Sequence, residues 1–446
     1  MTIRAPLSCN QEFLCLFDKN DGGGPFGPRY TLAEGWRLRG RPDPDVLREA
    51  LTDLAGRHEA LRTSVSRAEE DRHQLVHPVT PPALDVRDLS DTDPADRERR
   101  AQELVGEVEA VPLDVDRMPL LHAVLGRFSD DDAVLVVNTH HVATDGWSMQ
   151  LIIRDLAELY AARVERRRPR LPDVHQYREF ADWERASLTE DALAGPREYW
   201  RAKLRGAEIL ALPADRTRPE GEPMVAAVHR FVVDPETSAA TLRYAAEMRS
   251  SPFMVLMAAY YVALNRLTGL TDLVVPTITS NRGQPRFQET IGSFFNFLPL
   301  RTDLAGCATF RDVTRRTRTT CLDAYANDIP FSHIAGDTPE LMRQFADADR
   351  AVFGCQVSQF PAVLDETEHG GLRIGRVRRT LPQDVSSHIP DGALWDLEVE
   401  PGGDIVGSLK FNSRVFDRAT IEERADLLQR VLRSAVADPH APLPGL

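Results

Sequence analysis

AVLVVNTHHVATDG, residues 133–146, is the stretch that decides the fold of this chain. Its first five residues are all apolar, so both faces of the strand that they predict should be buried. Two histidines follow at the end of this strand, and an Asp-Gly pair then precedes a helix expected over about 147–164. The stretch therefore predicts a buried central strand, a turn with polar side chains and a helix.

The segments around this stretch predict a lobe of helices and strands. Residues 118–141 are typical of a β-hairpin with a polar turn. Residues 45–62 predict a helix, because leucines recur at spacings of three and four on one face, and Asp43 or Asp45 is its expected N-cap. After an arginine-rich run over 163–170, prolines interrupt the periodic pattern, so we expect the lobe boundary between 170 and 185.

The second half of the chain repeats the mixture of strand and helix. Its expected elements are a helix over 253–267, a strand over 273–278, a hairpin formed by 394–400 and 405–412, and a closing helix over 419–435. We therefore predict an α/β fold of two α+β sandwich lobes, with residues 1–175 in the first and 176–446 in the second. A ligand site is expected where the two lobes meet.

Composition excludes several classes of protein. The chain has 446 residues, with 68 acidic and 54 basic side chains and a formal net charge of −14, which argues against a nucleic-acid partner. No apolar run of about 18 residues predicts a membrane span, and no secretory signal is visible at the N-terminus. Five cysteines without a Cys-x-x-Cys pair predict reduced thiols, no zinc site and a cytoplasmic location.

The two histidines have different expected roles. Neighbours along a strand point to opposite faces, so His140 and His141 diverge, and one is expected to be structural while the other is exposed in a cleft. Histidine takes a proton from an amine or hydroxyl near neutral pH, Asp145 can pair with a cation, and Gly146 permits close backbone approach. From residue types alone, a histidine pair that is merely packed or solvated is as well supported as a functional one. Divergent neighbours do not chelate a metal together, and no third ligand is spaced for one.

The pattern His-His-x-x-x-Asp-Gly resembles that of the condensation domains of nonribosomal peptide synthetases, within the chloramphenicol acetyltransferase-like superfamily. Further segments are similar to other motifs of these domains, in the same order: residues 7–11, 57–63, 177–183, 291–301 and 327–331. The first of these departs from the family, because residues 12–14 are Glu-Phe-Leu in place of Arg-Leu-Trp. The resemblance covers nearly the whole chain.

The resemblance implies a catalytic set of His140, His141, Asp145 and Gly146. In the family the second histidine, here His141, deprotonates or positions the acceptor as it attacks a thioester carbonyl. Asp145 is expected to pair with Arg62 and so support the turn, and the Gly146 amide is expected near the developing oxyanion.

The resemblance also implies an architecture. The family fold is a V of two lobes with a central tunnel between them. Crossover and latch segments of the C-terminal lobe bridge the two lobes, and residues 279–282 resemble the crossover. Trp147 and Asn296 are candidates to line the tunnel, with a packing role as the alternative for each. The arginine run over 163–170 either docks a carrier protein or is a solvated face.

The implied reaction joins a carrier-tethered acyl or aminoacyl thioester to an amine or alcohol, in bacterial natural-product biosynthesis. No carrier or adenylation segment is visible, so we expect a peptidyl carrier protein to bring the donor in trans on its phosphopantetheine arm, with no other cofactor and no metal. The acceptor is a small molecule or is carrier-bound, and amide and ester remain open. An acyl-CoA-dependent acyltransferase and a non-catalytic carrier-recruiting module are the alternatives. Epimerisation domains share the His-His-x-x-x-Asp-Gly motif but need a further glutamate-bearing motif that this sequence does not show. Heterocyclisation domains have aspartates in place of the histidines.

Overall fold

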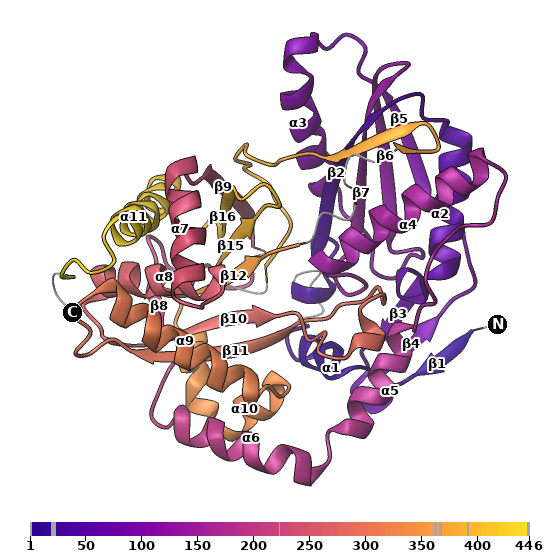
Figure 1. Cartoon of the computed structure of the whole chain (residues 1–446). Coiled ribbons are helices and arrows are strands. Elements are labelled where there is room, and N and C mark those ends of the chain that lie inside the picture. The colour runs from indigo at the N-terminus through magenta and orange to yellow at the C-terminus, as the bar shows by residue number, and fades with distance from the viewer. Residues whose placement is uncertain are drawn as a thin grey trace.

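Two lobes of mixed helix and strand lie side by side and are joined by segments that cross between them (Figure 1). The computed structural model describes residues 2–18, 24–222, 224–360, 364, 368–389 and 392–443. This arrangement confirms the predicted α/β class and its two lobes. The tunnel between the lobes stays a prediction.

The N-terminal lobe is built on a six-stranded sheet. Its strands, in spatial order, are β13 (Glu368–His369), β14 (Leu372–Arg376), β2 (Thr31–Arg39), β7 (Asp132–His140), β6 (Leu121–Ser129) and β5 (Ala83–Asp88). Helices α2 (Pro44–Arg57) and α4 (Gly146–Val164) pack on one face, and α3 (Arg97–Glu109) packs on the other. Strand β7 is buried along its whole length, as predicted: Leu135 contacts the α2 and α4 side, and Val134 contacts the α3 side.

Helix α2 is shorter than the pattern predicted. Asp43 caps its start by accepting hydrogen bonds from the amides of Asp45 and Val46, but the α-helix ends at Arg57 rather than at residue 62. His58 is extended, and its buried ring lies 2.8 Å from the carboxylate of Asp155 on α4. That contact stops the helix, and a 3-10 turn (Glu59–Arg62) follows.

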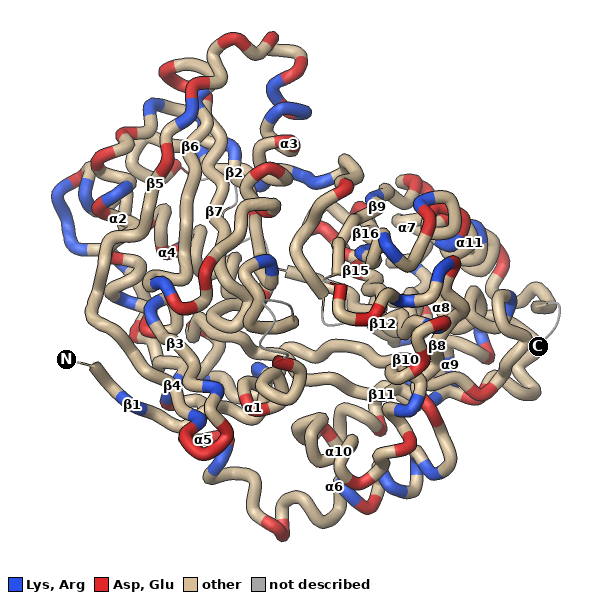
Figure 2. The backbone as a smooth tube through the Cα atoms, turned by 180° about the vertical axis from the view of Figure 1, so that it is seen from behind, with Lys and Arg blue, Asp and Glu red and all other residues tan. Residues whose placement is uncertain are grey.

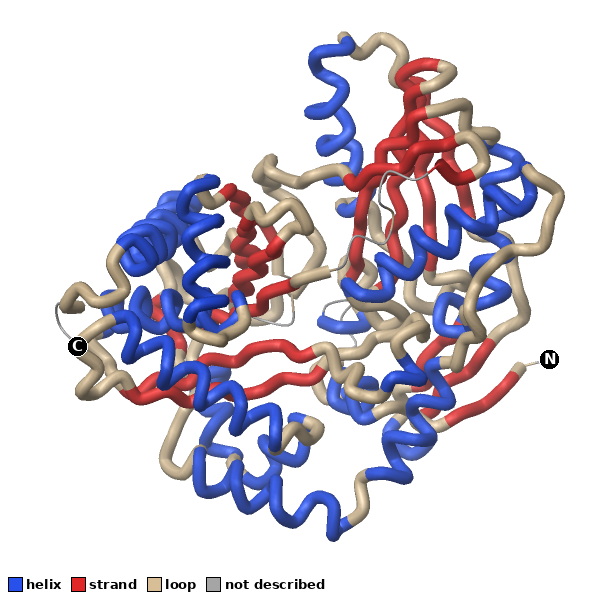
Figure 3. Tube along the Cα trace, viewed as in Figure 1, coloured by secondary structure: helices blue, strands red, loops and turns tan. Residues whose placement is uncertain are grey.

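The C-terminal lobe has a five-stranded sheet covered by helices on one face (Figure 3). Its order is β8 (Ala211–Pro213), β12 (Arg350–Ser358), β15 (Ala393–Val399), β16 (Ile405–Asn412) and β9 (Ala226–Val232). Helices α7 (Pro235–Glu247), α8 (Pro252–Thr268) and α11 (Arg418–Ala437) share its core. The predicted hairpin is confirmed, since β15 and β16 pair antiparallel from Ala393 opposite Phe411 to Val399 opposite Ile405.

The other elements are distributed over both lobes and the region between them (Figure 1). The α-helices among them are α1 (Cys9–Cys15), α5 (Tyr177–Ser187), α6 (Glu190–Lys203), α9 (Phe310–Ala326) and α10 (Phe331–Asp337). The strands are β1 (Ile3–Ala5), β3 (Thr63–Ser66), β4 (His73–Val76), β10 (Asp272–Thr279) and β11 (Asn296–Asp303), of which β10 and β11 form an antiparallel ribbon. Short 3-10 turns occupy Gly24–Phe26, Glu69–Asp71, Pro94–Asp96, Pro285–Phe287 and Pro339–Ala346.

Arginines at the end of β14 and just after it lie where the two lobes meet. Arg376 contacts Glu34 of β2 and Glu398 of β15, and Arg379 contacts the buried Glu109 at the end of α3. Residues 368–376, late in the chain, thereby complete the sheet of the N-terminal lobe. The lobe boundary at residue 175 stays a prediction. The six-stranded sheet contains strands from both sides of that boundary, because β13 and β14 come after it in the chain.

Charges of both signs are interspersed over the backbone (Figure 2). In the arginine-rich run, Arg163 pairs with Glu49 and Asp53, and Arg167 pairs with Glu158 and Glu165. These ion pairs favour a solvated face over a docking face. Among the described residues, no helix is long and apolar enough to cross a membrane, and no group of three or more His, Cys, Asp or Glu is placed to hold a metal ion.

Candidate active site

His140 and His141 diverge at the end of β7, as alternation along a strand predicts. The His140 side chain is fully buried; its Nε2 donates to the Gly27 carbonyl at 3.0 Å, and its Nδ1 accepts from the Val142 amide at 3.3 Å. Both ring nitrogens are therefore occupied in the neutral ring. Burial lowers the pKa of His140 to about 4, so this ring is a structural member of the motif.

The buried His140 predicts acid sensitivity of the fold. Its pKa lies near 6.5 in the unfolded chain and near 4 in the folded protein, so the stability is complete above pH 6.5 and is lost as pH falls toward 4. The expected loss is about 3 kcal/mol of unfolding free energy at the acid end. Urea unfolding between pH 7 and pH 4 measures it. A His140→Gln variant should show a shallower pH slope, and an equal slope would contradict this assignment.

His141 lies half-buried between two aromatic rings. It stacks on Tyr30, with ring centroids 4.8 Å apart and planes 17° from parallel, and Phe295 lies 5.6 Å away. Its Nδ1 lies 2.7 Å from the Thr144 carbonyl oxygen, which only accepts, so Nδ1 carries the proton. The Nε2 lone pair is therefore free to accept a proton from a substrate.

Burial lowers the pKa of His141 below 6.5, against the opposing effect of the Thr144 carbonyl. The neutral ring is the form that accepts a proton, so activity should hold at neutral pH and fall only as pH drops through this lowered pKa. We expect the acid limb of a kcat/KM profile to have its midpoint below pH 6.5. A midpoint above 6.5 would contradict the assignment of His141 as the base.

Asp145 pairs with Arg282 and not with Arg62, so the predicted pair was wrong. The Arg282 guanidinium donates to both carboxylate oxygens of Asp145 at 3.0 Å, and both residues are buried. Asp145 also caps α4 by accepting from the Ser148 amide at 2.6 Å, and it accepts from the Phe294 amide at 3.2 Å. The carboxylate thus fixes the start of α4 to the segment that precedes β11.

Arg62 instead binds backbone carbonyls. It donates to the carbonyls of Ala55, Gly56 and His77. The last carbonyls of a helix have no partner within it, and those at the end of α2 lie within reach of Arg62. Arg62 therefore supports the segment 57–63 and not the turn at His141.

Arg282 is the site residue that sequence reasoning missed. Its guanidinium stacks 4.0 Å from the Phe294 ring centroid, and it donates to the Phe287 and Thr290 carbonyls and to Ser148 Oγ. The available signal was its position in the crossover segment, residues 279–282, which precedes the 291–301 motif. The 291–301 motif carries no carboxylate, so a buried arginine near it requires an acidic partner from another part of the chain.

Gly146 is the first residue of α4, where backbone N–H groups have no carbonyl partner within the helix. A Cβ at this position would lie 2.7 Å from Cζ of Phe360, so a side chain does not fit without movement. The Phe360 ring therefore packs closely on the start of α4, and the role of the Gly146 amide as an oxyanion donor stays a prediction.

Trp147 and Asn296 both have structural contacts. Trp147 Nε1 donates to the Gln288 carbonyl at 2.9 Å. Asn296 donates to Asp328 Oδ1 and to the Ile329 carbonyl, both at 2.7 Å, and accepts from the Phe331 amide, so it joins two motif segments. Their roles as tunnel lining stay predictions.

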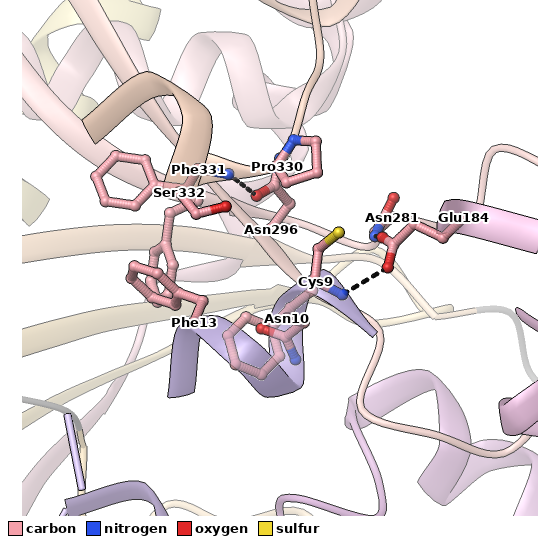
Figure 4. A pocket seen from close by; sticks show the side chains of 11 residues that line it. Cys9, Asn10, Phe13, Glu184, Asn281, Asn296, Pro330, Phe331 and Ser332 are labelled. Atoms are coloured by element: carbon pink, nitrogen blue, oxygen red, sulfur yellow. Dashed lines mark hydrogen bonds between the residues drawn. The ribbon is translucent and has the colours of Figure 1, made fainter. Parts of the chain in front are cut away.

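Asn296 also lines a small cavity beside the site (Figure 4). The cavity lies between α1 and α10, has a volume of about 10 Å³ and is large enough for about one water molecule. Phe295, which contacts the His141 ring, is another lining residue. A ring therefore stands between this cavity and the histidine.

Three motif segments far apart in sequence meet beneath α4. The Tyr177 hydroxyl lies 2.8 Å from Ser8 Oγ and donates to the Ser293 carbonyl at 2.9 Å, and Asn10 donates to the same carbonyl. A Cβ at Gly292 would collide with the Tyr177 ring, so glycine permits this contact. The motif segments therefore build one scaffold, and Ser148 of α4 is hydrogen-bonded to it at Gly292.

Two α/β lobes, with a base-competent histidine and a helix N-terminus where they meet, define a condensation-type acyl-transfer fold. The chain belongs to the Condensation domain family, whose model matches residues 4–445. It is homologous to the condensation domains of synthetases for antibiotics and other natural products. The predicted family and fold are thereby confirmed.

Relatives cover the chain almost completely. It is 32% identical over 443 residues to phosphinothricin tripeptide synthetase PhsC of Streptomyces viridochromogenes, matching 97% of this chain and 39% of that protein. It is 32% identical over 444 residues to a linear gramicidin synthase polypeptide of Brevibacillus parabrevis, matching 98% of this chain and 6% of the relative. The chain thus spans well under two thirds of these relatives.

Two solved structures match the chain over nearly their whole length. The SgcC5 protein of Streptomyces globisporus is 46% identical, with a TM-score of 0.94 over 98% of this chain and 100% of that one. The X-domain from teicoplanin biosynthesis is 26% identical, with a TM-score of 0.80 over 99% and 97% of the two chains. The match to SgcC5 therefore includes nearly all of both chains, and the two chains share one fold.

Proposed function

We propose that this chain condenses a carrier-tethered acyl or aminoacyl thioester with an amine or alcohol acceptor, with His141 as the base. The observation that carries the proposal is the hydrogen bond from His141 Nδ1 to the Thr144 carbonyl, which leaves the Nε2 lone pair available. The family membership supports a condensation reaction of this kind.

In the proposed mechanism, the acceptor gives its proton to His141 Nε2 as its oxygen or nitrogen attacks the thioester carbonyl. The negative charge moves to the carbonyl oxygen, close to the N-terminus of α4 at Gly146. Collapse of the tetrahedral intermediate breaks the carbon–sulfur bond. The departing thiolate takes the proton back from His141, so the enzyme returns to its neutral state.

The acceptor is proposed to be a free small molecule with a hydroxyl group, which makes an ester. The SgcC5 protein was crystallised with (R)-(-)-1-(2-naphthyl)-1,2-ethanediol, a compound with two hydroxyl groups and no amine. An amine acceptor, giving an amide, is the alternative that the peptide synthetase relatives support. We propose a peptidyl carrier protein as the donor's partner in trans, with its phosphopantetheine arm as the only prosthetic group involved, and a cytoplasmic location for the reaction.

Product formation tests this function. An aminoacyl-loaded carrier protein is offered to a panel of amines and alcohols, and the products are identified by mass spectrometry. The same acyl group on CoA, offered at equal concentration, separates a carrier-dependent enzyme from an acyl-CoA-dependent one. Absence of product with any donor, together with measurable carrier binding, would favour the recruiting module. The supporting observation for that module is that the similar X-domain from teicoplanin biosynthesis was solved in complex with OxyB.

A further inference from the structure

Glu109, the last residue of α3, is a buried carboxylate with partners in both lobes. Its side chain is 1% exposed, and its carboxylate faces three cations: Arg379 after β14, Arg230 on β9 and Lys410 on β16. Strands β9 and β16 belong to the sheet of the C-terminal lobe, whereas α3 packs on the sheet of the N-terminal lobe (Figure 1). Burial alone would raise the pKa of Glu109, but the three cations hold it well below its usual range, so the carboxylate is ionised.

The two oxygens of this carboxylate have different partners. Oε2 lies against the two arginines. Oε1 accepts hydrogen bonds from the hydroxyls of Ser386 and Ser387, both at 2.8 Å, and from the Ser387 amide at 3.0 Å. Lys410 donates to the same Ser387 hydroxyl and lies 3.4 Å from Oε1. Glu109 therefore holds the segment 386–388 at its start by three hydrogen bonds, and the charge that accepts them is itself neutralised by cations.

The end of this segment contacts the part of the chain that carries the stacking partner of His141. His388 donates its amide hydrogen to the Arg29 carbonyl at 2.8 Å. Tyr30 follows directly; its carbonyl accepts from the His141 amide at 2.8 Å, and its ring stacks on the His141 ring. Every link in this series is a backbone hydrogen bond, a chain neighbour or a ring contact, so a shift of segment 386–388 is passed on to the catalytic ring.

Segment 386–388 is also fixed to the C-terminal lobe. The Ser386 amide donates to the carbonyl of Ala226, the first residue of β9, at 2.7 Å. Lys410 on the neighbouring strand acts on the catalytic ring as well: burial is the main cause that lowers the pKa of His141, and the charge of Lys410 adds to it. The segment therefore lies between the C-terminal sheet and the reaction centre, with Glu109 as its anchor.

Resting on the condensation function proposed above, we propose that Glu109 is a positioning residue for that reaction: it holds segment 386–388 in place, and this segment fixes Tyr30 against the ring of His141. A base must face the acceptor at hydrogen-bond distance, and a displacement of about 1 Å lowers a rate by about a hundredfold. Substrate does not have to touch Glu109, because the backbone contacts carry its effect to the ring. Loss of this anchor therefore lowers kcat and leaves KM nearly unchanged.

The test compares two buried carboxylates that each have three cationic partners. Glu109→Gln keeps the shape of the side chain and removes its charge. Asp132→Asn is the matched control, because Asp132 is 3% exposed and pairs with Arg37, Arg39 and Arg97. It is the first residue of β7, at the opposite end of this strand from the histidine pair. Both variants should lose stability, since each leaves buried cations without their partner, but only Glu109→Gln should alter the site.

Steady-state rates with a carrier-bound donor are measured below the unfolding range of each variant. We expect Glu109→Gln to lower kcat by about tenfold to a hundredfold with KM nearly unchanged. Asp132→Asn should leave both constants nearly unchanged. An unchanged kcat in Glu109→Gln, or an equal fall in both variants, would overturn the proposal, since a merely structural carboxylate affects stability alone.

The ring itself is observed by NMR of isotope-labelled histidine in the protein without substrate. The signal of His141 is assigned by its absence in His141→Ala. Because the stacked Tyr30 ring shifts this signal, Glu109→Gln should displace it, whereas Asp132→Asn should leave it in place. If Glu109→Gln does not fold, the double variant Ser386→Ala with Ser387→Ala removes two of the hydrogen bonds and keeps the charges paired. It should displace the same signal, and an unmoved signal would reject the role of Glu109.

The two measurements separate this proposal from the proposed function. Product from the wild type, with kcat and the His141 signal both unchanged in Glu109→Gln, rejects the role of Glu109 and leaves the condensation function intact. A wild type that makes no product with any donor rejects the condensation reaction, and the NMR signal then decides by itself whether Glu109 positions the ring.

Discussion

Replacing His141 by alanine should lower the rate of product formation by about 10²- to 10⁴-fold, the range expected when a general base is removed. The reason is local: the Thr144 carbonyl holds the Nδ1 proton, and only Nε2 can accept the proton of the acceptor. The ring is half-buried and stacks on Tyr30, so the fold should survive its loss. Initial rates with a saturating carrier-bound donor, together with a melting curve, measure the two effects separately.

His440→Ala is the matched control, because His440 is exposed and its ring has no place in the site. It should leave rate and melting temperature unchanged. A rate in His141→Ala within a few-fold of the wild type would mean that the histidine does not act as the base. Carrier binding retained alongside that unchanged rate would weaken the base mechanism without affecting the family assignment.

Elements with strong local patterns were predictable from the sequence. The apolar run of residues 133–137 has side chains on both faces of a strand, and only a central strand buries both, which is what β7 does. The alternation of side chains along a strand was enough to predict that His140 and His141 point in different directions. The turn before β16 and the periodicity of the last helix identified the hairpin and α11 within a few residues.

Contacts that join distant segments were not predictable in the same way. Asp145 and Arg282 are 137 positions apart, and no local pattern connects them. The resemblance to the family implied Arg62 instead, but carbonyls at the end of α2 accept hydrogen bonds from that arginine. The end of α2 itself was misplaced for a related reason, since Asp155 on another helix decides where His58 lies.

The Asp145–Arg282 pair should be the strongest single stabilising contact of the site. Asp145→Ala removes the partner of a buried guanidinium, and breaking such a pair costs about 3–5 kcal/mol of unfolding free energy. It also removes the cap of α4, so the turn that carries His141 loses its anchor and the rate falls as well. Urea unfolding at neutral pH measures the stability, and the rate assay is run below the unfolding range.

A double-mutant cycle identifies the partner of Asp145. Arg282→Ala should also destabilise the protein strongly, because it leaves the Asp145 carboxylate buried without its partner. The double variant with Asp145→Ala should lose less stability than the sum of the two single losses, because neither charge is then left without its partner. Arg62→Ala combined with Asp145→Ala should be additive within about 0.5 kcal/mol, since Arg62 and Asp145 share no contact. Strong coupling of Asp145 to Arg62, with none to Arg282, would instead support the Asp145–Arg62 pair that the resemblance implied. The expected pattern makes the crossover segment, through Arg282, the element that holds the catalytic turn in place.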